Sequence, residues 1–182
     1  ISDVITEKLT MAYYKILEYK KTEKLTADEQ LVLGRMIAIG GIFRTILLKR
    51  LESSVEAFRR SVNTHIKFLD RLKKYLKKGK LLTKESFRKY ILQFDEEIDE
   101  EDVKEILEDF KTHDYRMDDL VSDVDIDIKL LTEILKKVNL ITPQDDAKLK
   151  ELKTKLLDLS KDGQVFLFTY YADTLDYIYK ET

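Results

Sequence analysis

The side chains that could carry catalysis or bind a metal are few. The 182 residues contain no cysteine and only two histidines, His65 and His113, so a thiolate metal site and a cysteine nucleophile are excluded. His113 is followed by Asp114, a pairing that suits hydrolytic metal sites, but two histidines are too few for such a site. We interpret both histidines as core or flanking residues.

Two acidic motifs resemble patterns that bind metal ions or take part in nucleotide hydrolysis in other proteins. Asp123, Asp125 and Asp127 have the spacing that opens a calcium-binding EF-hand loop, but Ile128 replaces its essential glycine and Ile134 its bidentate glutamate. We interpret them as an acidic helix face. Asp28-Glu29 lies in a helix-capping pattern and follows no strand, and neither GxxxxGK[ST] nor GxGxxG occurs. The chain therefore has no phosphate-binding loop of these kinds, no predicted catalytic residue and no predicted metal ligand.

Charge is the more informative signal. The 33 basic and 35 acidic residues nearly cancel, yet residues 44–80 hold 12 basic and 3 acidic side chains, and residues 93–133 hold 17 acidic and 4 basic ones. A basic stripe on a helix can follow a phosphate backbone, whereas the alternative is that it is solvated or pairs with the acidic region. The predicted nucleic-acid contacts on this stripe are Arg59, Arg60, Lys67, Arg71, Lys74 and Lys78.

The scarcity of helix breakers predicts long helices. Five glycines and one proline leave room for helices over about 3–21, from a Thr26–Glu29 capping box to the Gly40-Gly41 pair, and over about 117–138. The Gly40-Gly41 pair either ends the second of these helices or kinks a longer one. Further helices are expected near 83–94 and 99–110, and one begins at Thr142-Pro143 and runs to about 159. We expect no membrane-spanning segment and no signal peptide, and therefore a cytoplasmic location.

The strongest helical pattern runs from residue 42 to about 78. Apolar residues recur there at alternating spacings of three and four, a heptad seam that His65 shares; they are Leu51, Val55, Phe58, Val62, Leu69, Leu72 and Leu76. We predict one helical arm of roughly 37 residues, about 55 Å long at 1.5 Å per residue.

The last twenty residues have a different pattern. The run from Gln164 to Thr169 is rich in β-branched and aromatic residues and predicts a buried strand, followed by a helix from Tyr171 to Lys180. The expected fold is thus an all-α multi-helix bundle at 1–160 with one long arm. Residues 161–182 are expected to be the first β-α unit of a truncated parallel-sheet lobe.

Two segments resemble known sequences. Residues 44–59, with the hexad Lys-Arg-Leu-Glu-Ser-Ser at 49–54, resemble the helical segment after the first motor lobe of RapA-like Swi/Snf superfamily-2 helicases. Asp146 and Lys148, followed by Phe168, Thr169, Tyr171, Asp173 and Thr174, resemble the start of the second RecA-like lobe. Their order and separation are similar to those of the family, which carries a helical insertion between its lobes.

The resemblance implies a fragment of an ATP-dependent helicase or translocase, a nucleotide-binding hydrolase that acts on nucleic acid; the expected nucleic acid is double-stranded DNA. ATP and Mg²⁺ are implied for the parent protein, whose nucleotide-binding loop, acidic box and arginine finger would lie outside this chain. The fragment would couple lobe closure to contact with nucleic acid or a partner, would contact the other motor lobes, and would not itself be catalytic. The family places Thr169 near the nucleic-acid backbone.

Other functions stay open. A stand-alone helical adaptor would bind a partner, or a second copy of itself, through the heptad seam of the long helix. An enzyme with a new site in the bundle lacks a convincing set of side chains. The acidic region at 99–127 could also compete with phosphates for the basic arm, an autoinhibitory arrangement suggested by the charge split.

Overall fold

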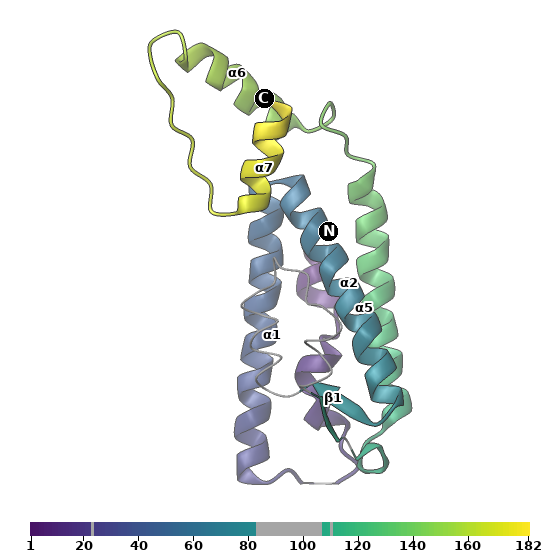
Figure 1. Ribbon diagram of the computed structural model, residues 1–182. Coiled ribbons are helices and arrows are strands. Elements are labelled where there is room, and N and C mark those ends of the chain that lie inside the picture. Colours follow the sequence, from purple (N-terminus) through teal and green to yellow (C-terminus); the bar gives the residue numbers. More distant parts are fainter. Residues whose placement is uncertain (23, 83–106, 110) are drawn as a thin grey trace.

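Three long helices form an elongated bundle (Figure 1) in the computed structural model, which describes residues 1–22, 24–82, 107–109 and 111–182. They are α1 (Ala27–Ser53), α2 (Val55–Lys77) and α5 (Met117–Asn139). Helix α1 packs on α2, which packs on α5, and successive helices run in opposite directions. The all-α class with a long helix is confirmed.

The long arm predicted over 42–78 is wrong, because the chain turns back at Ser54. This residue has extended dihedral angles of −158° and 156°, and its hydroxyl accepts a hydrogen bond from the Ala57 amide at 3.1 Å. A serine side chain that binds the backbone in this way ends one helix and begins the next. The result is a hairpin of a 27-residue and a 23-residue helix, and Gly79 adopts a left-handed conformation just after α2.

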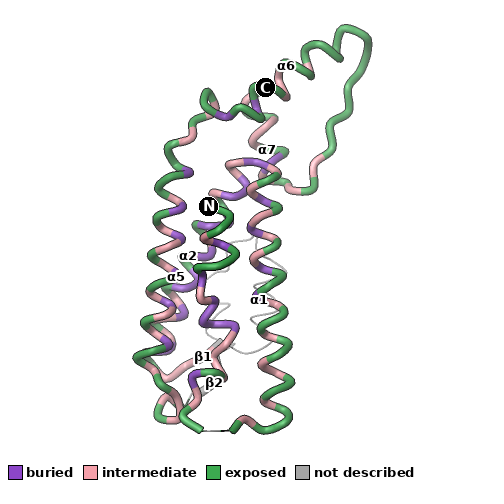
Figure 2. The backbone as a smooth tube through the Cα atoms, turned by 180° about the vertical axis from the view of Figure 1, so that it is seen from behind, coloured by how far each residue is buried: buried purple, intermediate pink, exposed green. Residues whose placement is uncertain are grey.

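The core lies between the inward faces of these helices and an N-terminal segment (Figure 2). The seam of α2 supplies Phe58, Val62, Leu69, Leu72 and Leu76, all buried against the rest of the chain. Gly40 lies inside an uninterrupted α1, where a Cβ atom would stand 3.1 Å from the buried Tyr14 ring. Glycine at 40 therefore permits close packing of the N-terminal segment on α1.

The helix predicted over 3–21 is broken in two. A π-helical turn at Val4–Lys8 (η1) and a 3₁₀ helix at Ala12–Tyr19 (η2) flank Met11, whose φ of 55° is left-handed. The cause is the buried carboxylate of Asp127 on α5, which accepts hydrogen bonds from the Thr10 amide at 2.6 Å and the Met11 amide at 2.9 Å. These bonds replace helical ones, so a tertiary contact overrides the apolar periodicity.

Other elements follow the sequence more closely. The Thr26–Glu29 capping box is present at the start of α1, α5 matches its prediction closely, and α6 (Ala147–Leu159) ends where expected. Its start is corrected from Thr142 to Ala147, since the Asp145 carboxylate accepts the Thr142 hydroxyl and amide and closes a turn instead.

Between α2 and α5 the chain forms a small ribbon. Strands β1 (Lys80–Leu82) and β2 (Leu107–Asp109) pair antiparallel, with Leu81 opposite Glu108. Residues 107–109 are therefore not helical as predicted, and the rest of the helices expected at 83–94 and 99–110 lies outside the described residues. A short 3₁₀ turn at Thr112–Asp114 (η3) leads into α5.

The C-terminal strand is also corrected. Residues 164–169 form an extended segment without a strand partner among the described residues, and Phe166 and Phe168 are 78% and 89% exposed. The following helix α7 (Ala172–Glu181) is confirmed. Figure 1 shows this segment looping outward beside α6 before it returns to the bundle at α7.

Helix α1 is long and apolar enough, by length and composition alone, to cross a membrane, and the absence of a membrane-spanning segment stays a prediction. The helix meets this criterion because apolar residues occupy both its sides: Phe43 and Leu47 face the core, while Leu31 and Ile42 are more than half exposed.

The buried Asp127 carboxylate can be tested for its role in holding the N-terminal segment. Replacement by alanine should lower the free energy of unfolding by about 2 kcal/mol, because two buried amides lose their acceptor. Asp125, two residues away, makes a half-exposed ion pair with Lys73, so Asp125→Ala should cost less than about 1 kcal/mol. Urea denaturation checks both values, and equal losses would contradict the assignment.

Candidate functional site

A set of polar contacts, partly buried, lies where α7 meets the turn between α1 and α2. Arg50, 2% exposed, donates from Nη1 to one carboxylate oxygen of Asp173 at 2.9 Å. Arg60 donates to the other oxygen at 2.7 Å. The Arg50 guanidinium also lies over the Tyr171 ring, 4.5 Å from its centroid, which is a cation–π contact. One carboxylate of α7 thus joins two arginines from two helices.

Three hydroxyl groups extend this contact. Thr174, buried in the first turn of α7, forms hydroxyl–hydroxyl hydrogen bonds with Ser53 at 2.8 Å and with Ser54 at 2.9 Å. Because Ser54 also caps α2, the residue that turns the chain is bonded directly to α7.

Cations cover the exposed carbonyl groups at two helix ends nearby. The Lys148 ammonium of α6 donates to the carbonyls of Glu52 and Ser53, at the end of α1. Arg59 donates to the carbonyls of Val138 and Ile141, at the end of α5, at 3.1 and 3.0 Å. Cations are stabilised at helix C-termini because the unpaired carbonyls carry partial negative charge.

Helices α6 and α7 are joined by a further bond. Asp146 caps α6 by accepting the Leu149 amide at 3.0 Å, and it also accepts the Tyr177 hydroxyl at 3.1 Å. Partial burial and the neighbouring Asp146 carboxylate raise the pKa of Tyr177 to about 12, so this hydroxyl keeps its proton and remains a donor. We call this whole set the apex junction; its members are Arg50, Ser53, Ser54, Arg59, Arg60, Asp146, Lys148, Asp173, Thr174 and Tyr177.

The apex junction brings together the two segments that carry the sequence resemblance. The hexad at 49–54 contributes Arg50, Ser53 and Ser54, while the later segment contributes Asp146, Lys148, Asp173 and Thr174. They are separated by about 100 residues in sequence and in direct contact in space. Paired charges and satisfied hydroxyls of this kind hold elements together, and they offer no free nucleophile.

The two histidines do not meet. His65 is buried in the core, with its ring 4.3 Å from that of Phe43 and stacked on Phe68, and burial lowers its pKa to about 3. His113 is exposed and lies 3.1 Å from Asp114. The interpretation of His65 as a core residue is confirmed.

The three aspartates of the EF-hand-like motif also point to separate partners. Asp123 accepts the Tyr19 hydroxyl, Asp125 pairs with Lys73, and Asp127 binds the N-terminal segment. In the described part of the chain, no group of three His, Cys, Asp or Glu residues could hold a metal ion.

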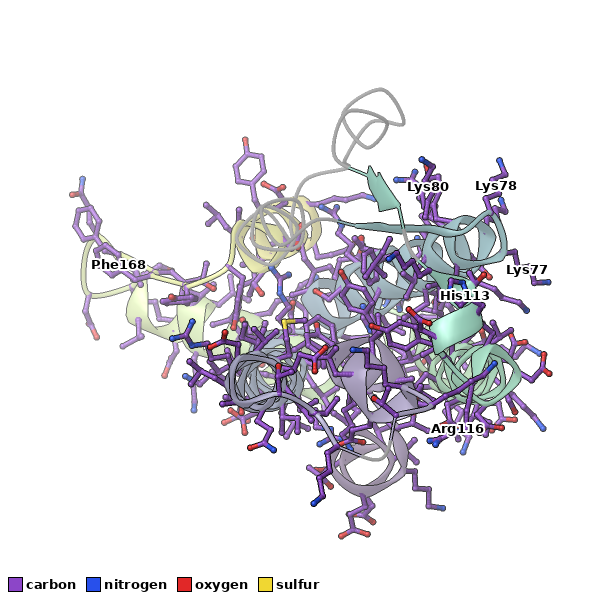
Figure 3. All side chains as sticks on the ribbon, turned by 90° about the horizontal axis from the view of Figure 1, so that it is seen from below. Lys77, Lys78, Lys80, His113, Arg116 and Phe168 are labelled. Carbon is purple, nitrogen blue, oxygen red and sulfur yellow. The ribbon has the colours of Figure 1, made fainter. Side chains whose placement is uncertain are left out.

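The residues predicted to contact nucleic acid fall into separated groups. Arg59 and Arg60 are engaged at the apex junction, and Thr169 lies in the outward loop, where its hydroxyl accepts the Tyr171 amide at 3.4 Å. Lys67 and Arg71 follow along α2, and Lys74 and Lys78 lie exposed at its far end. Figure 3 shows Lys77, Lys78 and Lys80 gathered at that end, near His113.

Sequence reasoning did not assign Arg50, Lys148, Asp173 or Thr174 to a site. These residues belong to the hexad and to the Asp-x-Lys and Tyr-x-Asp-Thr motifs, which the sequence shows. The sequence alone does not show that the residues of these motifs contact one another. Comparison with protein-family models, with curated proteins and with solved structures found no match.

The buried charge pair makes a sharp test of how α7 is held. Asp173→Ala leaves the Arg50 charge buried without its carboxylate, and breaking a buried pair costs about 3 kcal/mol. Amide hydrogen exchange in α7 should therefore accelerate roughly 100-fold. Asp176→Ala, on the exposed side of the same helix, should leave exchange nearly unchanged. Similar exchange in both variants would show that the pair does not hold α7.

The buried His65 predicts a loss of stability in acid. Its folded pKa of about 3 lies below the unfolded value of 6.5, so the unfolded chain binds the proton more readily and stability falls as pH drops below 6.5. Between pH 7 and pH 5 this histidine should cost about 2 kcal/mol. His65→Leu should remove that part of the pH dependence in urea denaturation, and the exposed control His113→Gln should retain it.

Proposed function

We propose that this chain is the helical coupling region of a Swi/Snf-type nucleic-acid motor, with α7 as the first helix of the second motor lobe. The chain contributes no phosphate-binding loop, and ATP and Mg²⁺ would be held by other parts of the parent protein. Its own task is mechanical: to join the lobe to the helical bundle in a defined orientation.

The observation that carries this proposal is the contact between the two resembling segments. A resemblance in two separate places gains weight when the same residues meet, and here Asp173 and Thr174 bind Arg50, Ser53 and Ser54 directly. The residues that resemble the family in sequence therefore share one physical role here, which is to hold α7 against the helical hairpin.

The energetics of the apex junction suit a coupling element. Separating Asp173 from Arg50 would leave a charge in a nearly water-free position, which is strongly unfavourable. Motion of the lobe would therefore carry α1 and α2 with it, rather than slide past them. Lys148, bound to the end of α1, adds the preceding helix α6 to the same unit.

The contact with duplex DNA is proposed for the far end of α2. Lys74, Lys77 and Lys78 are exposed there, whereas Arg59 and Arg60 are held in internal contacts. Lys73 pairs with Asp125 of the acidic region, a contact that supports, at this one position, the proposed competition between acidic side chains and phosphates.

The adaptor alternative would need another surface. The seam residues on which it depended are covered by other parts of the same chain, since Phe58, Val62 and Leu72 are fully buried. A partner-binding role would fall to the outer face of α1.

Binding to duplex DNA tests the proposal on this chain itself. Wild type should bind a labelled duplex at low salt, and the Lys74→Glu/Lys78→Glu variant should bind more weakly, with a log–log salt slope about 2 units shallower, because two phosphate contacts are lost. The control Lys136→Glu/Lys137→Glu changes the charge equally on exposed residues of α5 and should keep the wild-type slope. Fluorescence anisotropy measures all three, and absent binding or equal effects would contradict the assigned contact.

A further inference from the structure

The outer face of α1 carries a regular stripe that the bundle does not cover. Residues at alternating spacings of three and four are all exposed; they are Asp28, Leu31, Arg35, Ala38, Ile42, Thr45 and Lys49. Leu31 and Ile42 on this stripe are 55% and 56% exposed. This periodicity is that of a helix–helix seam, and it lies opposite the side that packs on α2.

The stripe is electrostatically self-complementary. Its acidic end, Asp28, lies ten residues before Ala38 and its basic end, Lys49, eleven residues after it, and neither makes a hydrogen bond or ion pair within the described residues. A second copy aligned antiparallel about Ala38 would place each Asp28 within one residue of the other copy's Lys49, which is within reach of the long lysine side chain. A parallel pair would instead place like charges together.

Small residues allow the helices to approach closely. Gly34 and Gly41 lie beside the stripe, and a Cβ atom at either position would meet nothing within 4 Å. In the antiparallel alignment Ile42 of one copy falls beside Gly34 of the other, and Leu31 beside Thr45, so large residues face small ones. Glycine is unfavourable inside a helix, and close helix packing is a physical reason for it here.

We propose that the outer face of α1 is an interface between two copies of this chain, paired antiparallel about a two-fold axis at Ala38. Such an isologous contact is self-complementary and closes after two subunits. This inference is independent of the proposed motor function, because none of the stripe residues belongs to the apex junction.

Engineered disulfides test the geometry, because the chain has no cysteine of its own. Ala38→Cys should cross-link to itself on mild oxidation, since the two-fold axis brings the two positions together. Leu31→Cys should not cross-link to itself but should do so when mixed with Thr45→Cys. Glu133→Cys, exposed on α5, is the control and should remain monomeric. Self-cross-linking of Leu31→Cys would contradict the antiparallel arrangement.

Charge reversal tests the association itself by sedimentation equilibrium. Wild type should reach twice the 21.5 kDa mass of one chain, and Asp28→Lys or Lys49→Asp alone should each raise the dissociation constant roughly tenfold, because symmetry places every pair twice. Combining the two reversals should restore wild-type affinity. A monomer at all concentrations, or a dimer that ignores the single reversals, would overturn the proposal, whereas duplex binding and α7 exchange report separately on the motor function.

Discussion

The arrangement of the molecule depends on the hydrogen bond between the Ser54 hydroxyl and the Ala57 amide. That bond gives α2 its own N-terminus and lets the chain reverse within one residue, so that two long helices pack side by side. Without the reversal, Arg50 and Arg60 would lie far apart along a single rod. With it, they approach from two helices and share the carboxylate of Asp173.

The reversal also leaves a helix C-terminus whose partial negative charge is stabilised by a nearby cation. Ending α1 leaves carbonyl groups unpaired at Glu52 and Ser53, and Lys148 covers them. At the end of α5, Arg59 donates hydrogen bonds to the unpaired carbonyl groups in the same way. Four basic residues near the turn are therefore committed to helix ends and to Asp173; they are Arg50, Arg59, Arg60 and Lys148. Within the described part of the chain, these contacts are why the proposed site for an external anion lies at the far end of α2 rather than near the turn.

Periodicity and capping patterns predicted α5, α7 and the start of α1, because in those segments local and tertiary preferences agree. They failed where a side chain from elsewhere, or a single hydroxyl, outweighed the pattern. Asp127 is more than 100 residues from the amides that it binds, and Ser54 interrupts a seam that continues in register across the break. Several residues of the apex junction belong to motifs that the sequence shows. Their contact in space depends on the helical hairpin, and the hairpin was not predicted because the spacing of apolar residues continues unbroken across Ser54.

The exposed segment at 164–169 and the buried contact of α7 have a joint geometric consequence. Only Tyr170 and Tyr171 separate the segment from α7, and Tyr171 already lies under Arg50. The carboxyl end of the segment is therefore held at the apex junction, while its own side chains Phe166 and Phe168 stay exposed. Because Tyr171 contacts Arg50 and Asp173 binds it, a displacement of the segment would act directly on the end of α1.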